Sequence, residues 1–256
     1  NLYIVEQEDP SENFQAAWLA AAKHLQSQCR EGICWIRANL KRPFIEHLSF
    51  RIGNQLFFIF VEAEEFKLSN RFDAFIGCAE LANAIPCMIK MNKTFASYAP
   101  SDDGWGLLHA VTKAPVDPLS LVSDELIEMS DWELHDFVIN VVKKGLEKEG
   151  KTVYSTCSDM EVNPSLWFVE NDVHYWVIVR GHRHPMKIAG RPEGLDKIAE
   201  GVPGENSAGY YAIVTVANGD DPFNPKAADN GNFLPLYRGH GMHIKYDGIH
   251  SIVPAH

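Results

Sequence analysis

Cationic side chains gather in the last third of the sequence, where their types and spacing suit the binding of an anion. The candidate ligand-binding residues are Arg180, His182, Arg183, His184, Arg238, His240 and His243, with Arg191 and Lys245 beside them in the sequence. A local cationic cleft on an acidic protein attracts anionic ligands, because opposite charge concentrates there. This part of the chain is therefore where we expect a site for a small anion.

Metal binding is the alternative chemistry for these histidines. His240 and His243 have HxxH spacing, but they lie in a glycine-rich stretch without a carboxylate at ligand spacing. The five cysteines are unevenly spaced and include no CxxC pair, so neither a zinc site nor a disulfide framework is indicated. We expect no metal, reduced cysteines, and histidines that lie at the surface or make ordinary hydrogen bonds.

Composition excludes several classes of protein. The chain has 256 residues, of which 46% are hydrophobic, and a formal net charge of −11. An acidic protein is a poor non-specific binder of nucleic acid, whose affinity comes mainly from phosphate contacts. No apolar run is long enough to span a membrane, and the first ten residues lack the basic and apolar regions of a signal peptide. We expect a cytoplasmic protein.

The sequence repeats itself. Residues 44–63 resemble residues 162–181 at an offset of about 118, with Leu48 matching Leu166 and Phe57–Ile59 matching Tyr175–Val177. Each segment is predicted to be a β-hairpin. Gly53-Asn54 and Asn171-Asp172 divide the apolar stretches, and these residue types tolerate the positive φ of tight turns.

Matching elements surround the two hairpins. Apolar residues at helical spacing predict helices upstream, and further short strands and helices follow in the same order. The expected helices cover residues 12–25, 73–84, 131–146 and 193–200, and the expected strands outside the hairpins cover 33–36, 87–91, 152–156 and 210–216. Both halves therefore have the order α-β-β-β-α-β. We predict an α/β (α+β) protein of two similar tandem units, residues 1–118 and 119–256, each a mixed sheet flanked by helices, arising by duplication.

This repeated unit resembles the core of the restriction-endonuclease-like, or PD-(D/E)XK, superfamily. The resemblance implies one acid near the start of the hairpin, then an acid and a lysine two residues apart on its second strand. The two carboxylates hold a divalent cation, and the lysine helps to orient water and to stabilise charge at the phosphate. Phe60 and Ile178 occupy the positions of the strand acid, Glu62 and Arg180 occupy those of the lysine, and Pro164 is the counterpart of Glu46. Neither half has a complete site.

Two functions are compatible with this pattern. The first is a non-catalytic binding or interaction protein made of two degenerate nuclease-like domains, whose partner is another protein or a small anionic ligand. The alternative is a nuclease or phosphodiesterase that uses Mg²⁺ or Mn²⁺ at a rebuilt site. The residues available for such a site are Glu46, Glu62, Asp159, Glu161 and Arg180.

Overall fold

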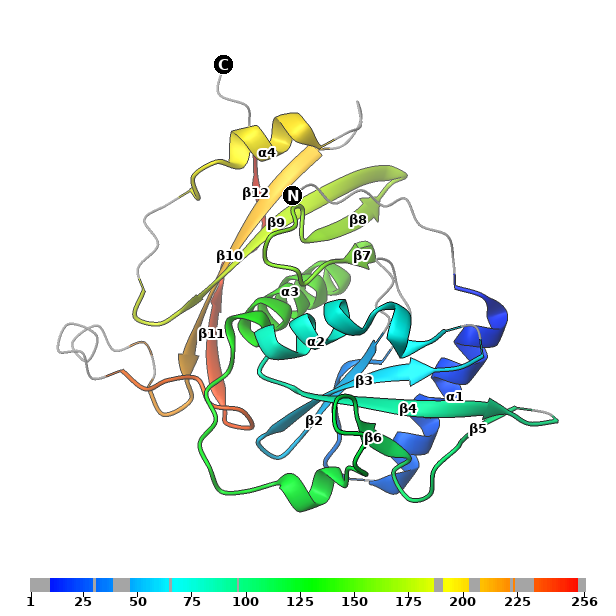
Figure 1. The fold of residues 1–256 in the computed structure, drawn as a ribbon. Helices are drawn as coiled ribbons and strands as arrows, with labels where there is room; N and C mark the ends of the chain where they lie inside the picture. Colours follow the sequence, from blue (N-terminus) through cyan, green and yellow to red (C-terminus); the bar gives the residue numbers. More distant parts are fainter. Residues whose placement is uncertain are drawn as a thin grey trace. The chain divides into compact units, whose positions relative to one another are not determined.

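The chain forms two compact units. The computed structural model describes residues 10–29, 31–38, 47–64, 66–95, 97–186, 191–202, 208–221, 223 and 233–252. Described residues of the first unit lie between Pro10 and Ile127, and those of the second begin at Glu128 (Figure 1). Each unit is described by itself.

The chain passes from one unit to the other between Ile127 and Glu128, nine residues after the boundary expected from the sequence. The intervening segment is attached to the first hairpin. Asn54 donates from Nδ2 to Ser123 Oγ at 3.0 Å and to the Glu125 carbonyl oxygen at 2.8 Å.

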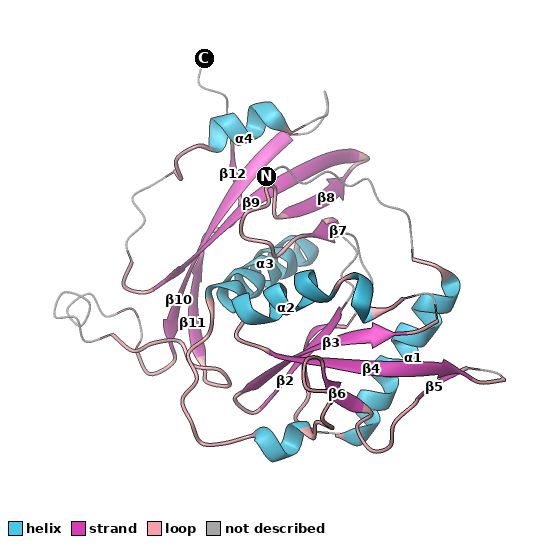
Figure 2. Ribbon diagram, viewed as in Figure 1, coloured by secondary structure: helices cyan, strands magenta, loops and turns pink. Residues whose placement is uncertain are grey.

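The first unit is a six-stranded mixed sheet with helices on its faces (Figure 2). Its elements are α1 (Glu12–Gln28), β1 (Cys34–Arg37), β2 (His47–Ile52), β3 (Gln55–Glu62), η1 (Leu68–Asn70), α2 (Phe72–Leu81), β4 (Ile85–Lys93), β5 (Tyr98–Pro100), β6 (Leu107–His109) and η2 (Pro118–Leu121). Strands β1 to β3 are antiparallel, and β4 returns parallel to β3 after α2.

The second unit repeats this arrangement. Its elements are α3 (Asp131–Lys148), β7 (Thr152–Thr156), β8 (Leu166–Glu170), β9 (Val173–Arg183), α4 (Leu195–Gly201), β10 (Ala208–Asn218), β11 (Met242–Tyr246) and β12 (His250–Ser251). The strand order is β11-β10-β9-β8-β7 with β12 on β10, against β1-β2-β3-β4-β5 with β6 on β4 in the first unit. The predicted fold class, two mixed sheets flanked by helices, is confirmed.

The two hairpins have the same register. Leu48 pairs with Ile59, and 118 positions later Leu166 pairs with Val177. Both preceding ladders are also irregular at matching places, between residues 35 and 37 and between residues 153 and 155. The extra residue on the outer strand therefore falls at the same point of each sheet.

Alternation along the central strands divides each core into two faces. In the first unit, Phe57, Ile59 and Val61 of β3 pack in one cluster with Phe14 and Trp18 of α1. In the second unit, Val177 and Val179 of β9 pack with residues of α3, whereas Trp176 and Ile178 pack on the other face with Leu195 of α4. These buried faces account for the long β-branched and aromatic runs in the sequence.

Local interactions at the helix and turn ends follow the residue types in the sequence. Ser130 Oγ accepts from the Glu133 amide, and the Glu133 carboxylate accepts from the Ser130 amide, which completes a capping box at the start of α3. Asn171 and Asp172 have φ of 51° and 62°, as a tight hairpin turn requires. Ser11 caps α1 by accepting from the Phe14 amide at 3.1 Å.

Strands β5, β6, β11 and β12 were not expected from the sequence. They have two to five residues each, and β11 is largely exposed, so neither length nor apolar alternation distinguishes them from loops. Among the described residues, none of the helices has the length and apolar character needed to cross a membrane.

His47 of the first unit has a half-buried imidazole whose Nε2 atom is buried. His47 of β2 stacks on Phe58, with ring centroids 4.4 Å apart, and its Nε2 is buried without a hydrogen-bond partner. Burial, followed by the positive charge of Arg37, lowers the pKa of His47 from 6.5 to about 3. His47 is therefore neutral at physiological pH.

Candidate functional site

The two positions that correspond to the strand acid of a nuclease lie in the core. Phe60 is 1% exposed, and its ring centroid is 5.8 Å from that of Phe75 in α2. Ile178 is fully buried in the cluster that includes Trp167 and Leu195. Neither side chain can ligate a cation, so the incomplete motif of the sequence is also incomplete in space.

The remaining carboxylates considered for a rebuilt site are dispersed. Glu46 lies outside the described residues. Glu62 belongs to the first unit and accepts from the Leu68 amide at 3.1 Å. Asp159 and Glu161 belong to the second unit, where Asp159 Oδ1 accepts from the Glu161 amide at 2.9 Å. Within the described ranges, no three His, Cys, Asp or Glu side chains are grouped to hold a metal ion.

A pocket of about 310 Å³ in the second unit brings three of the predicted cationic residues together. It lies where β9 continues past the start of β8, so that residues 180–183 are next to the first turns of α3. The lining residues are Asp131, Leu134, His135, Met160, Arg180, Gly181, His182, Arg183 and Met186. We call this cavity the Arg180 pocket.

Arg180 is held in place by neutral acceptors. Its Nη1 donates to Asn163 Oδ1 at 3.0 Å and to its neighbour's carbonyl oxygen, that of Val179, at 3.1 Å. No carboxylate of the described residues forms an ion pair with it. Burial lowers the pKa of Arg180 from its ordinary value, because a partly buried guanidinium loses hydration. The positive charge is thus partly dehydrated without a described counter-charge.

His182 points to the same side of β9 as Arg180, because side chains two residues apart share a face of a strand. Burial and then the charge of Arg180 both lower the pKa of His182 below 6.5. At pH 7 the imidazole is therefore mainly neutral, and it is available to donate or accept one hydrogen bond.

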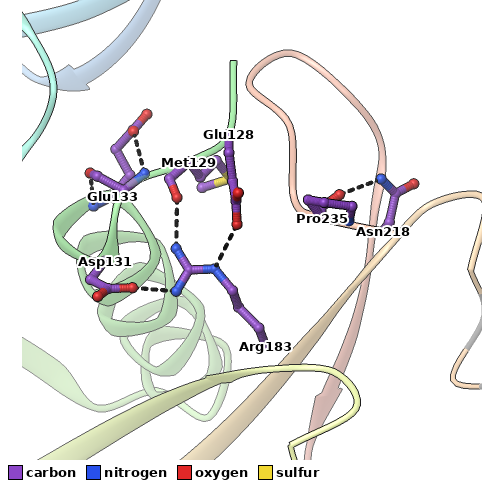
Figure 3. A network of polar contacts seen from close by, with 8 residues as sticks. Glu128, Met129, Asp131, Glu133, Arg183, Asn218 and Pro235 are labelled. Carbon is purple, nitrogen blue, oxygen red and sulfur yellow. Dashed lines mark hydrogen bonds and ion pairs between the residues drawn. The ribbon is translucent and has the colours of Figure 1, made fainter. Parts of the chain in front are cut away.

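Arg183 has a different role from Arg180, although both line the pocket. Figure 3 shows its guanidinium between residues 128 and 131 at the beginning of α3. Arg183 donates to Asp131, with which it also forms an ion pair. It donates to the Met129 carbonyl oxygen at 2.6 Å as well, and Glu128 Oε1 lies 3.9 Å from Arg183 Nε. Arg183 therefore joins β9 to α3, and its charge is already balanced.

Arg238 is enclosed in the core of the second unit. Its Nε donates to both carboxylate oxygens of Glu133, at 2.9 and 3.0 Å, and Nη2 donates to Oε2 at 2.7 Å. The two side chains are 2% and 5% exposed. Asn218 Nδ2 donates to the Pro235 carbonyl oxygen at 2.6 Å, which ties the segment before Arg238 to β10 (Figure 3). Arg238 is placed for stability and does not reach the Arg180 pocket.

The other predicted cations do not line the Arg180 pocket. His184 and Lys245 surround Phe223, with the His184 ring centroid at 5.3 Å and Lys245 Nζ at 5.2 Å from the ring.

The remaining cations make separate contacts. His243 Nε2 is 2.9 Å from the Gly219 carbonyl oxygen, and His240 lies edge-on to Tyr237. Arg191 forms an exposed ion pair with Asp196. The sequence pattern thus divides into a pocket, a core ion pair and an aromatic cluster.

Several residues of the pocket, and the residue that holds Arg180, are not indicated by the sequence. Asn163, which accepts from Arg180, stands beside Pro164 and matches no motif position, and the lining residues Leu134 and His135 belong to an ordinary helical pattern. Their signal is weak, because nothing in the spacing indicates that the first turns of α3 meet the end of β9. Met160 and Met186 lie in irregular segments on either side of the hairpin.

At the equivalent strand end of the first unit, carboxylates stand at the positions of Arg180 and His182. Glu62 and Glu64 stand 118 positions before Arg180 and His182, and they line a pocket of about 300 Å³ in the first unit. Three lysines, at positions 67, 90 and 93, line the same pocket. The cavity at the end of the central strand is thus common to both units, but its chemistry is not.

A match to a protein-family model covers most of the second unit. A family model described as "Domain of unknown function (DUF8840)" matches residues 132–252. This range runs from the beginning of α3 to the end of β12, and thus covers the elements of the second unit. Neither the search of curated proteins nor that of solved structures found a match. The chain is therefore similar, over its second unit, to a domain family whose function is not assigned.

Proposed function

We propose that this chain is a non-catalytic binding protein, built from two degenerate restriction-endonuclease-like units, and that the second unit binds an anionic group in the Arg180 pocket. The shared strand order and the common register of the hairpins support an origin by duplication. The burial of Phe60 and Ile178 supports the loss of the ancestral metal site. A fold that persists without its site is free to serve another purpose.

The environment of the Arg180 guanidinium is the observation that carries the proposal. Removing a guanidinium from water is costly unless an anion compensates it, and buried charges in proteins are normally paired. Arg180 is partly buried, lines a cavity of ligand size, and has only neutral described partners. An anion in the pocket supplies the missing charge, and Arg is well suited to hold a carboxylate or phosphate through two parallel hydrogen bonds.

Composition supports a small ligand and a reducing compartment. With a net charge of −11, long-range repulsion opposes a polyanion such as nucleic acid, whereas a small anion within a local cationic pocket is largely screened from the rest of the surface. The five cysteines are unevenly spaced and include no CxxC pair, a pattern that favours reduced thiols over a disulfide framework. Reduced thiols are typical of cytoplasmic proteins, so a cytoplasmic location is part of the proposal.

Titration of the full chain with inorganic phosphate and with acetate, followed by calorimetry or NMR shifts, tests the proposal. We expect saturable binding of at least one anion to the wild-type chain and a loss of at least tenfold in affinity in Arg180→Gln, because the charge-assisted hydrogen bonds are removed. Arg191→Gln is the matched control, since it removes an exposed arginine of the same unit whose partner is Asp196. Equal binding by both variants would refute the site.

A nuclease assay with Mg²⁺ and Mn²⁺ tests the absence of catalysis. We expect no cleavage of single- or double-stranded DNA or RNA, because core side chains occupy both positions of the strand acid. Measurable cleavage that Glu46→Ala abolishes would show that a rebuilt metal site operates, and would overturn this part of the proposal.

A further inference from the structure

We infer that the ligand of the Arg180 pocket is a small organic monocarboxylate with an apolar body. The inference rests on the proposed function, because it assigns a chemical class to the anion bound there. It follows from three properties of the pocket: the shape of the free guanidinium edge, the balance of charge, and the apolar side chains of the lining.

The free edge of Arg180 accommodates one planar anion. Arg180 makes two hydrogen bonds to described residues, and Nη1 donates in both, to Asn163 Oδ1 and to the Val179 carbonyl oxygen. Nε and Nη2 remain as a pair of parallel donors on one side of the guanidinium. A carboxylate places two coplanar oxygens against such a pair, which is the side-on bidentate geometry of arginine–carboxylate pairs.

The charged residues of the pocket can compensate one negative charge on a ligand. Arg183, the second cation of the lining, is balanced by Asp131, with Glu128 close to it. His182 is mainly neutral at pH 7, because burial and Arg180 lower its pKa. Of the two arginines in the described lining, Arg180 is the one without a carboxylate partner. A carboxylate carries one negative charge. A phosphate monoester carries about 1.5 to 2 negative charges at pH 7, so part of its charge would stay unpaired in a partly dehydrated cavity.

Apolar side chains border the same cavity. Leu134 of α3 is 4% exposed and forms part of the wall, whereas Met160 and Met186 are 42% and 62% exposed. Exposed apolar groups around a pocket are typical of a ligand groove, and methionines adapt their shape to the bound group. The volume of about 310 Å³ is at the low end of the range for small-molecule sites, so the apolar body is short or consists of a single ring.

Titration of the full chain with acetate, butyrate, hexanoate, benzoate and inorganic phosphate at pH 7 tests the inference. Each methylene that leaves water strengthens binding about fourfold. Because the apolar wall covers only part of an alkyl chain, we expect hexanoate and benzoate to bind at least tenfold more tightly than acetate and phosphate. Met160→Ser with Met186→Ser should remove this preference, so that the variant binds hexanoate no more tightly than it binds acetate. Arg180→Lys, which keeps the charge but loses the parallel donors, should weaken all carboxylates.

The outcomes separate this inference from the proposed function. If phosphate and acetate bind as tightly as hexanoate and Arg180→Gln abolishes all binding, the anion site stands and the monocarboxylate assignment is overturned. If no anion binds, or if binding is the same in Arg180→Gln, the proposed function and the inference both fail. Thermal unfolding and circular dichroism of every variant verify that it is folded before its affinity is compared.

Discussion

The buried ion pair between Glu133 and Arg238 makes a prediction whose size follows from the structure. In Arg238→Met, the Glu133 carboxylate loses three hydrogen bonds and remains 5% exposed with an uncompensated charge. Breaking a buried pair from one side typically costs about 3–5 kcal/mol, and we expect a loss of that size in the free energy of unfolding of the second unit. The segment that bears Arg238 and the N-terminus of α3 should loosen together.

A double variant separates the effect of the uncompensated Glu133 charge from the effect of losing the contact with Arg238. In Glu133→Leu with Arg238→Met, no charge is left buried, but the capping interaction of Glu133 with the Ser130 amide is lost, at about 1 kcal/mol. The double variant should therefore be more stable than Arg238→Met by about 2 kcal/mol or more, because relief of the stranded charge exceeds the loss of the cap.

Hydrogen exchange on peptides from α3, β9 and β10 measures this effect within the second unit, and urea unfolding gives the global value. Arg191→Met is the matched control, because its pair with Asp196 is 39% and 51% exposed and should contribute less than about 1 kcal/mol. If Arg238→Met is as stable as that control, or the double variant is no more stable than Arg238→Met, the reasoning is refuted.

Three further predictions concern packing and pH. Because the folded pKa of His47 is about 3 and the unfolded value is 6.5, the unfolded chain binds a proton that the folded unit excludes. The first unit should therefore lose about 1.4 kcal/mol per pH unit as the pH falls from 6.5 to 3, and an unchanged pH profile in His47→Gln would contradict this. Gly209→Ala should destabilise the second unit by about 1–3 kcal/mol, since a Cβ there would overlap the ring of Trp176. Gly77→Ala, in open space within α2, should stabilise the first unit by about 0.5–1 kcal/mol. Thermal melts in which Gly77→Ala destabilises and Gly209→Ala stabilises the protein would contradict both expectations. Ile178→Asp should lower stability by several kcal/mol without conferring Mg²⁺ binding. A calorimetric Mg²⁺ signal in a folded variant would count against the proposed loss of a metal site.

The order of elements could be predicted from the sequence because local rules determine it. The capping box at Ser130 and Glu133, the turn at Asn171-Asp172 and the apolar run of β9 are contained within a few residues each. The short strands could not be predicted, because β11 and β12 depend on pairing with β10 and have no apolar pattern of their own.

The candidate site was predictable only in part. Arg180 and His182 share a face of one strand, so their proximity follows from their spacing. The sequence could not reveal which cations are already paired, because Arg183 meets Asp131 across 52 positions and Arg238 meets Glu133 across 105. Whether a cation is available to a ligand depends on such long-range partners, and these are known only from the fold.

The central claim is that the Arg180 guanidinium contacts an anion through Nε and Nη2. The most direct measurement is the NMR resonance of the Arg180 Nε–H group, assigned by its absence in Arg180→Lys and followed during titration of the full chain with hexanoate. We expect a large, saturable shift of this resonance and little change at Arg191. No shift at Arg180, or equal shifts at both arginines, would contradict it.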